Sequence, residues 1–160
     1  MDTNNKNNVG LDLAATNQVI TKLSELLADY QVFYANLRGL HWNIKGDKFY
    51  DLHGIYEEYY NEIAEKIDET AERIVILGGT PENNFSEYLK VSKVKEISHV
   101  FDWETGVLHV IETLQLLVSK LRKLHATGIK SGDHGSVSLA NHGIKSFEKK
   151  IWMLSAYSQK

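Results

Sequence analysis

Residues 49–77 read FYDLHGIYEEYYNEIAEKIDETAERIVIL, and they carry both the fold signal and most of the candidate site. Apolar side chains recur every three or four positions along the stretch, which is the spacing of a helix that buries one face. A double glycine at 78–79 follows, and glycine commonly ends a helix. The stretch therefore predicts one long amphipathic helix.

The same spacing recurs on both sides of this helix. Long helices are predicted over residues 13–40, 100–124 and 137–154, and a short one within 84–94. Asp133, in the glycine-rich loop 128–135, is placed to cap the last of them. The first two long helices and the last two are joined by short loops, whereas about 20 residues separate the second from the third. We predict an all-α four-helix bundle with one long crossover that carries a short extra helix.

Length and composition are those of a single globular domain. The chain has 160 residues, 42% of them apolar and 24% charged, with a formal net charge of −3. No apolar run approaches the roughly 20 residues of a membrane-spanning helix. Without cysteine, any metal must be held by nitrogen and oxygen ligands. We expect a flexible polar lead over residues 1–10 and a bundle domain over residues 11–160.

The 49–77 helix carries acidic residues on two different faces. With successive residues about 100° apart, one group lies opposite the apolar face and is assigned to solvent: Glu58, Glu62, Glu65 and Glu69. A second group falls in an arc of roughly 100° beside the apolar face: His53, Glu57, Asp68 and Glu72. Asp68 and Glu72 are one turn apart, so they repel each other unless a cation, a proton or a basic side chain lies between them. A metal ion would satisfy both.

One chain cannot bring the histidine and carboxylate ends of this helix together. His53 and Asp68 are fifteen residues apart, about 22 Å along a helix, whereas metal–ligand bonds are roughly 2 Å long. His41 ends the preceding helix near His53, so it is equally remote from Asp68. A two-fold axis that crosses the helix near Tyr60 and Asn61 would place the histidine end of one copy beside the carboxylate end of another. We predict two such sites per dimer.

Each candidate ligand also has a structural interpretation. Solvation, or pairing with Arg73 or a neighbouring helix, would account for Asp68 and Glu72, and a bond to a backbone carbonyl would account for His41 as a core histidine. The remaining histidines show no convergent spacing and are assigned structural or surface roles: His99, His109, His125, His134 and His142.

Two linked motifs resemble those of the Dps family, the miniferritins named as DNA-binding proteins from starved cells. The first is His41-Trp-x-x-x-Gly-x-x-Phe-x-x-x-His53 and the second is Asp68-x-x-x-Glu72-Arg73. The resemblance covers about residues 15–157 and includes Leu77-Gly-Gly-x-Pro81 and Glu148-Lys-x-x-Trp-Met-Leu154. It implies a ferritin-like bundle.

The resemblance also implies roles for individual residues. His41, Asp68 and Glu72 would be the principal iron ligands, and His53 would complete or orient a second, weaker metal position. Glu57 stands where the family usually has aspartate, so its longer side chain would alter that second position. Trp42 would lie beside the site.

Family membership implies a ferroxidase and iron store. Twelve subunits, built from dimers, would form a hollow shell in the cytoplasm, where Fe(II) is oxidised, preferably by hydrogen peroxide, and the ferric product is stored. This chemistry would protect the cell and its DNA from oxidative damage. Imidazole and carboxylate accept both Fe(II) and Fe(III), although zinc, manganese or cobalt can compete for the same donors.

Three features depart from this family or from ordinary ferritins. The first eight residues contain Lys6 alone and the C-terminal residues are almost neutral, so we expect DNA binding to be weak or absent, with nucleoid association as an alternative. The usual acidic pore segment reads Asp133-x-x-Ser136-x-Ser138, which lacks the second acid. Ordinary ferritins use two Glu-x-x-His pairs within one bundle, and the one match here is Glu96-Ile-Ser-His99.

The sequence thus favours three functions in a definite order. A peroxide-consuming ferroxidase and iron store comes first. A DNA-coating nucleoid protein with secondary iron binding is the main alternative, and a helical assembly protein with a vestigial metal site is the third.

Overall fold

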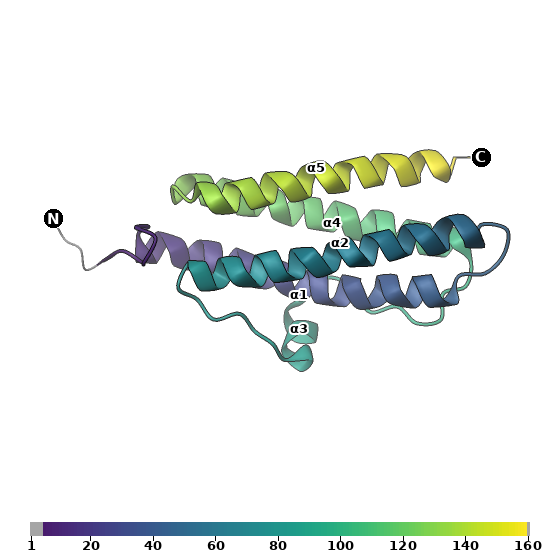
Figure 1. Cartoon of the computed structure of the whole chain (residues 1–160), viewed down its shortest axis with the longest axis horizontal. Helices are drawn as coiled ribbons and strands as arrows, with labels where there is room; N and C mark the ends of the chain where they lie inside the picture. The colour runs from purple at the N-terminus through teal and green to yellow at the C-terminus, as the bar shows by residue number, and fades with distance from the viewer. Residues whose placement is uncertain (1–4, 160) are drawn as a thin grey trace.

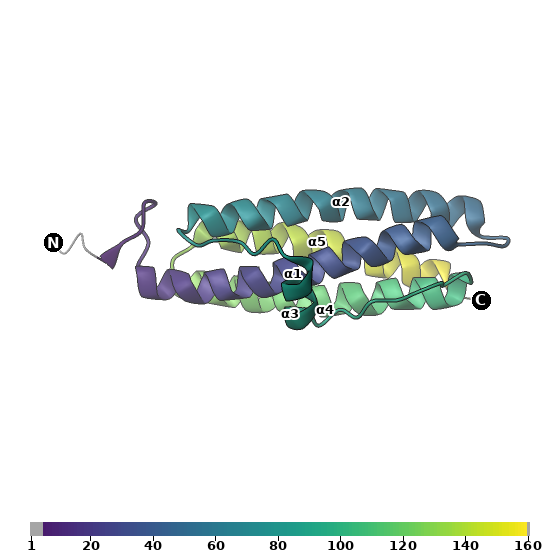
Figure 2. The same cartoon turned by 90° about the horizontal axis from the view of Figure 1, so that it is seen from below.

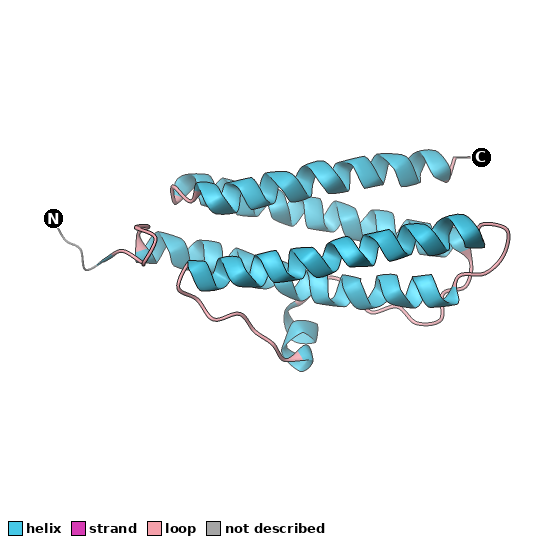
Figure 3. Cartoon of the chain, viewed as in Figure 1, coloured by secondary structure: helices cyan, strands magenta, loops and turns pink. Residues whose placement is uncertain are grey.

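The computed structural model describes residues 5–159, which form four long helices and one short helix (Figure 1). Their bounds are α1 Leu13–Asn43, α2 Phe49–Ile76, α3 Phe85–Val91, α4 Trp103–Lys130 and α5 His134–Tyr157. The predicted bundle, with its short extra helix in the crossover, is confirmed. Loops connect the helices, and the part of the chain described contains no β-sheet (Figure 3).

Aspartate side chains begin three of the long helices. Each accepts a hydrogen bond from the backbone N–H three residues later, at 2.8 to 3.0 Å, which satisfies one of the free amides of the first turn. The three capping residues are Asp12, Asp102 and Asp133. The predicted cap of the last helix is confirmed. The loop before it is shorter than predicted, residues 131–133, because Gly132 makes the turn with a φ of 67°.

The bundle consists of two antiparallel hairpins. α1 pairs with α2, α4 pairs with α5, and α1 packs against α4 between them (Figures 1 and 2). The largest fully buried side chains include two tyrosines, two phenylalanines and a series of leucines, among them Tyr30, Tyr56, Phe33, Phe147, Leu23 and Leu37. Burial of these apolar stripes drives the association of the helices.

The long crossover is fastened to the bundle by a buried carboxylate. Asp29 of α1 is fully buried, and its Oδ1 accepts from Ser92 Oγ at 2.9 Å and from the Lys93 backbone N–H at 2.6 Å. Its Oδ2 forms an ion pair with Lys120 of α4. The Asp29 side chain therefore joins α1, α4 and the residues that follow α3. The α3 helix itself lies beside α1 (Figure 2).

A second polar group fastens the later part of the crossover. The Asn36 amide donates to the Lys95 carbonyl at 2.8 Å and accepts from the Ile97 N–H at 3.1 Å. Its nitrogen also lies 3.2 Å from Nε2 of His109 on α4. Burial lowers the pKa of His109, against the opposing effect of the Glu112 carboxylate. A neutral His109 can accept the hydrogen bond from Asn36.

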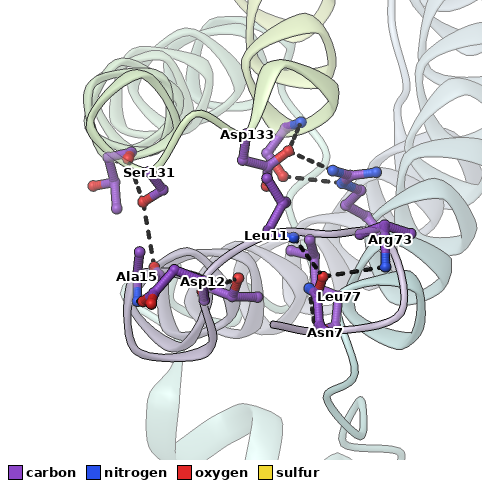
Figure 4. Close-up of polar contacts among 12 residues, drawn as sticks. Asn7, Leu11, Asp12, Ala15, Arg73, Leu77, Ser131 and Asp133 are labelled. Atoms are coloured by element: carbon purple, nitrogen blue, oxygen red, sulfur yellow. Dashed lines mark hydrogen bonds and ion pairs between the residues drawn. The ribbon is translucent and has the colours of Figure 1, made fainter. Parts of the chain in front are cut away.

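The segment before α1 folds against the end of the bundle. Asn7 donates to the Leu77 carbonyl at 3.2 Å and accepts from the Leu11 N–H at 2.9 Å (Figure 4). Residues 1–4 of the expected lead lie outside the described residues, so flexibility of the lead stays a prediction. Within residues 5–159, none of the helices combines the length and apolarity that crossing a bilayer requires.

Candidate functional site

His41 and His53 are packed together where α1 meets α2. Their rings stack with centroids 3.8 Å apart and planes 17° from parallel. His41 Nδ1 lies 2.8 Å from the His53 carbonyl oxygen, and His53 Nδ1 lies 2.9 Å from the His41 carbonyl oxygen. Each imidazole is therefore fixed by the backbone of the other residue.

These reciprocal bonds determine which ring nitrogen carries the proton. A carbonyl oxygen can only accept, so Nδ1 of each histidine must be the N–H donor. Nε2 of a neutral ring then keeps a lone pair, which is the form that binds metals. Among residues 5–159, neither Nε2 has a hydrogen-bond partner. The interpretation of His41 as a backbone-bonded core histidine accounts for Nδ1 and leaves Nε2 available.

Asp68 and Glu72 lie on the exposed face of α2. Neither carboxylate forms a hydrogen bond or an ion pair with residues 5–159. Arg73, the basic partner considered from the sequence, instead pairs with Asp133 and donates to Ser136 Oγ at 3.1 Å, as Figure 4 shows. Within one chain these two carboxylates are left to solvent.

The described part of a single chain contains no cluster of three or more histidine, aspartate or glutamate residues that could hold a metal. The structure brings His41 and His53 together and leaves Asp68 and Glu72 further along α2, about 22 Å and about 28 Å from His53 by helix geometry. The ligand set shared between two chains stays a prediction.

Two further predicted residues are close in sequence to the histidine pair: Trp42 follows His41, and Glu57 lies one turn after His53. The Trp42 side chain is 63% exposed, and the Arg38 guanidinium lies 4.7 Å from its ring centroid. Glu57 is exposed and accepts a weak hydrogen bond from the Tyr60 hydroxyl at 3.5 Å. The Tyr60 ring also meets the His41 ring edge-on, with centroids 5.4 Å apart.

Tyr60, which the sequence places near the predicted two-fold axis, and Arg38, which the sequence motifs do not include, both contact predicted site residues. Helical spacing could have predicted both contacts, because residues three or four apart share a face of a helix. Glu57 and Tyr60 are three apart, and Arg38 and Trp42 are four apart.

The acidic residues assigned to solvent are exposed in the structure, with one exception. Glu62 is half-buried between α2 and α5, where it accepts from Ser146 Oγ at 2.6 Å and pairs with Lys150 at 2.5 Å and Lys66 at 3.5 Å. Burial alone would raise the pKa of Glu62, but these hydrogen bonds and cations hold it below its ordinary value. The solvent assignment of Glu62 is wrong, because α5 supplies partners that the helix pattern alone does not reveal.

The alternative ferritin-type pair lies outside the helices. Glu96 and His99 belong to the extended part of the crossover, where their spacing of three does not place them on one helix face. His99 has a φ of 56° and an exposed side chain. Asp133, the remaining acid of the predicted pore segment, is buried and paired with Arg73, so its charge is already compensated within the chain.

Comparisons with known proteins agree with the motifs and the fold. Residues 20–160 match the family described as the ferritin-like domain. A Porphyromonas gingivalis protein named DNA protection during starvation protein is 47% identical over 142 residues, which are 89% of each chain. DNA protection during starvation protein 2 of Bacillus anthracis is 34% identical over 140 residues, which are 88% of this chain and 96% of the relative.

Solved structures show the same likeness in three dimensions. The crystal structure of a Dps protein from Vibrio cholerae, described as a member of a superfamily of ferritin-like diiron-carboxylate proteins, superposes with a TM-score of 0.95 at 36% identity. The match covers 99% of this chain and 100% of that one. This chain belongs to the Dps family of ferritin-like proteins.

Proposed function

We propose that the chain oxidises Fe(II) at sites shared between two copies and stores the ferric product. His41 and His53 of one copy would face Asp68 and Glu72 of the other, with Glu57 and Trp42 beside them. The observation that carries this proposal is the histidine pair, whose Nδ1–H groups are held by carbonyls so that both Nε2 atoms remain free to bind a cation. Iron is the substrate of this reaction.

The chemistry of the donors supports iron as the substrate. Two imidazoles and two carboxylates accept Fe(II) and the harder Fe(III), whereas zinc, manganese and cobalt are expected competitors. With hydrogen peroxide as oxidant, two Fe(II) and one H₂O₂ give two Fe(III) and two hydroxide ions. Removing both reagents in the cytoplasm would protect DNA, as the names of the relatives suggest for those proteins.

Uncovered apolar side chains near the site support association with a second copy. Trp42, Tyr50 and Val75 are 63%, 90% and 58% exposed, and they flank the candidate ligands on α1 and α2. Exposed apolar surface of this kind marks protein–protein contacts. A two-fold axis near the middle of α2 would cover it and unite the ligands, and further contacts would build the shell of twelve subunits.

Removing one ligand from each half of the shared site tests the proposal. The double variant His41→Ala with Asp68→Ala should oxidise Fe(II) with peroxide at least about 100-fold more slowly, because even indirect supports of metal ligands contribute 10- to 100-fold. Stopped-flow absorbance of ferric formation measures the rate, and light scattering checks that the shell persists.

A matched control removes two charges elsewhere on the same helix. Glu65→Gln with Glu69→Gln changes exposed acids of α2 outside the candidate site, and this variant should keep the wild-type rate. Equal rates in the wild type and the His41/Asp68 variant would contradict the proposal. A shell without saturable iron binding would favour the assembly protein with a vestigial site.

DNA coating is the second candidate, favoured by the names of the relatives. The described N-terminal residues contribute Lys6 alone as a basic side chain, and the formal net charge is −3. Phosphate contacts make binding steeply salt-dependent, so a gel shift at low salt that disappears as salt rises would support coating. We expect no shift, which would leave protection to the iron chemistry.

A further inference from the structure

Gly106 lies buried in the first turn of α4, where that helix comes close to both helices that carry the histidine pair. A Cβ atom at this position would lie 2.7 Å from the Tyr56 hydroxyl oxygen of α2 and 3.3 Å from Leu40 Cδ2 of α1. The first distance is shorter than the contacts that Cβ atoms make in folded proteins. The space of the missing side chain is therefore bordered by one side chain from each of the two helices.

Leu40 and Tyr56 adjoin the two histidines in the chain. Leu40 directly precedes His41 on α1, and Tyr56 lies three residues after His53 on α2. Both side chains are buried, with 1% and 0% of their surface exposed, and the Tyr56 hydroxyl has no hydrogen-bond partner within residues 5–159. Packing alone therefore locates this hydroxyl, and in a closely packed interior an added atom displaces its neighbours.

The geometry of the histidine pair depends on the separation of α1 and α2. The two distances from Nδ1 to a carbonyl oxygen are 2.8 and 2.9 Å, and the ring centroids are 3.8 Å apart. An increase of about 0.5 Å in the separation would take both hydrogen bonds beyond the ordinary limit of about 3.2 Å. Each ring could then turn, and its Nε2 atom would no longer be held in one direction.

We propose that Gly106 is a positioning residue for the histidine pair. Its missing side chain lets Tyr56 and Leu40 pack against α4, and this packing keeps α1 and α2 at the separation at which the two histidines exchange carbonyl hydrogen bonds. Glycine is unfavourable within a helix relative to alanine, and the close approach of another group is one physical reason for its use. The consequence for metal binding rests on the proposed function, whereas the position of the two rings does not.

The test compares Gly106→Ala with the wild-type assembled protein in two measurements. The first needs no metal and uses solid-state nitrogen NMR of protein labelled in its histidine rings, under slightly alkaline conditions in which free imidazoles are neutral. The signals of His41 are assigned by their loss in His41→Gln. The wild type should show a protonated Nδ1 and an unprotonated Nε2, and Gly106→Ala should lose or broaden this pattern.

The second measurement is an anaerobic titration with Co(II), followed by absorbance. Gly106→Ala should bind Co(II) at least about 10-fold more weakly than the wild type, because groups that orient metal ligands contribute 10- to 100-fold to affinity.

Two further variants separate this role from a general effect of overpacking. Combining Gly106→Ala with Tyr56→Phe removes the oxygen that the new methyl group meets and leaves the nearest ring carbon 3.7 Å away, so most of both losses should be recovered. Gly143→Ala is the matched control, because its Cβ would meet Leu121 Cδ1 at 2.8 Å between α5 and α4. Leu121 lies about 22 Å along α4 from Gly106, so this variant should match the wild type in both measurements.

The outcomes distinguish the role of Gly106 from the proposed function. Wild-type ring signals and Co(II) affinity in Gly106→Ala would overturn the positioning role, and so would equal losses in Gly143→Ala or no recovery in the double variant. A wild type that shows the expected ring signals but binds no Co(II) at the histidine pair would overturn the proposed function. The NMR comparison would then still decide whether Gly106 positions the rings.

Discussion

Asp29 is a buried carboxylate whose partners come from three parts of the chain. It lies on α1, pairs with Lys120 on α4 and accepts hydrogen bonds from Ser92 and Lys93 in the crossover. A buried charge is tolerated when such partners replace the lost water, and removing one partner leaves the other charge uncompensated. Asp29 therefore fastens the crossover to α1 through these hydrogen bonds, and Lys120 compensates its charge.

Replacing Asp29 with alanine should destabilise the fold strongly. We expect a loss of about 3–5 kcal/mol in the free energy of unfolding, because Lys120 would be left largely buried without its anion. Denaturant unfolding at fixed protein concentration measures the change. Glu25→Ala, which removes a half-exposed pair with Lys22, should cost less than about 1 kcal/mol, and equal effects of the two substitutions would contradict this role of Asp29.

At the scale of elements, the extended residues after α3 depend on side chains of α1 and α4. Asn36 binds two backbone groups of this segment, and His109 accepts a bond from the same amide. Burial lowers the pKa of His109, so the folded chain favours its neutral form. A group of this kind stabilises the fold above its ordinary pKa of about 6.5, and this contribution is lost as the pH falls through the lowered value.

Acidification should therefore loosen the crossover through His109. The midpoint temperature of unfolding should decrease when the pH is lowered from 7.5 to 5. His109→Gln should show a smaller decrease, because the glutamine amide can accept a hydrogen bond without titrating. Thermal unfolding at the two pH values measures this difference. His142→Gln, at an exposed position of α5, is the control, and an identical pH response of wild type and His109→Gln would contradict the assignment.

Local sequence predicted the helices well because their spacing, caps and glycines act over a few residues. Asp133 predicts the N-cap of α5, and the glycines at 78–79 predict the end of α2. The partners of Glu62 and Arg73 could not be found in this way. Apart from Lys66, one turn from Glu62, they lie on α5 or at its N-cap, 60 or more positions away, and helix periodicity alone does not determine which residues of two helices meet.

In the candidate site, too, local features could be predicted from the sequence and contacts between helices could not. Periodicity predicted one face for His53, Glu57, Asp68 and Glu72, and the end of the preceding helix predicted that His41 lies near His53. The family motifs added Trp42. The stacking of His41 on His53 and their exchange of carbonyl bonds depend on the angle between α1 and α2, which the residue pattern does not determine.

At the scale of the whole molecule, the proposed function places a second copy of the chain against one face of the α1–α2 hairpin. Small and apolar residues accompany the candidate ligands there, including Ala64, which is exposed near the middle of α2. Any residue close to a two-fold axis meets its own copy, so a new charge at that place is introduced twice in one interface. Assembly and activity should therefore fail together when such a charge is added.

Ala64→Arg tests this coupling. We expect a fall in mass from the assembled shell to smaller species in analytical ultracentrifugation, with helical circular dichroism retained and rapid iron oxidation lost. Glu65→Arg adds the same side chain one residue later, on the sector assigned to solvent, and should preserve assembly. An Ala64→Arg protein that remains fully assembled and active would exclude a two-fold contact at the middle of α2.

The hydrogen bonds that His41 and His53 each donate to the other's carbonyl also affect the free energy of metal binding. Both rings are immobilised when the chain folds, so their loss of rotamer freedom occurs before any ion arrives. Binding at the proposed site would then require reorganisation mainly of the Asp68 and Glu72 side chains, which lie exposed on the helix face. In the proposed site the imidazole half would be preorganised and the carboxylate half would adapt, so differences in affinity among divalent ions should arise chiefly from how Asp68 and Glu72 close around each of them.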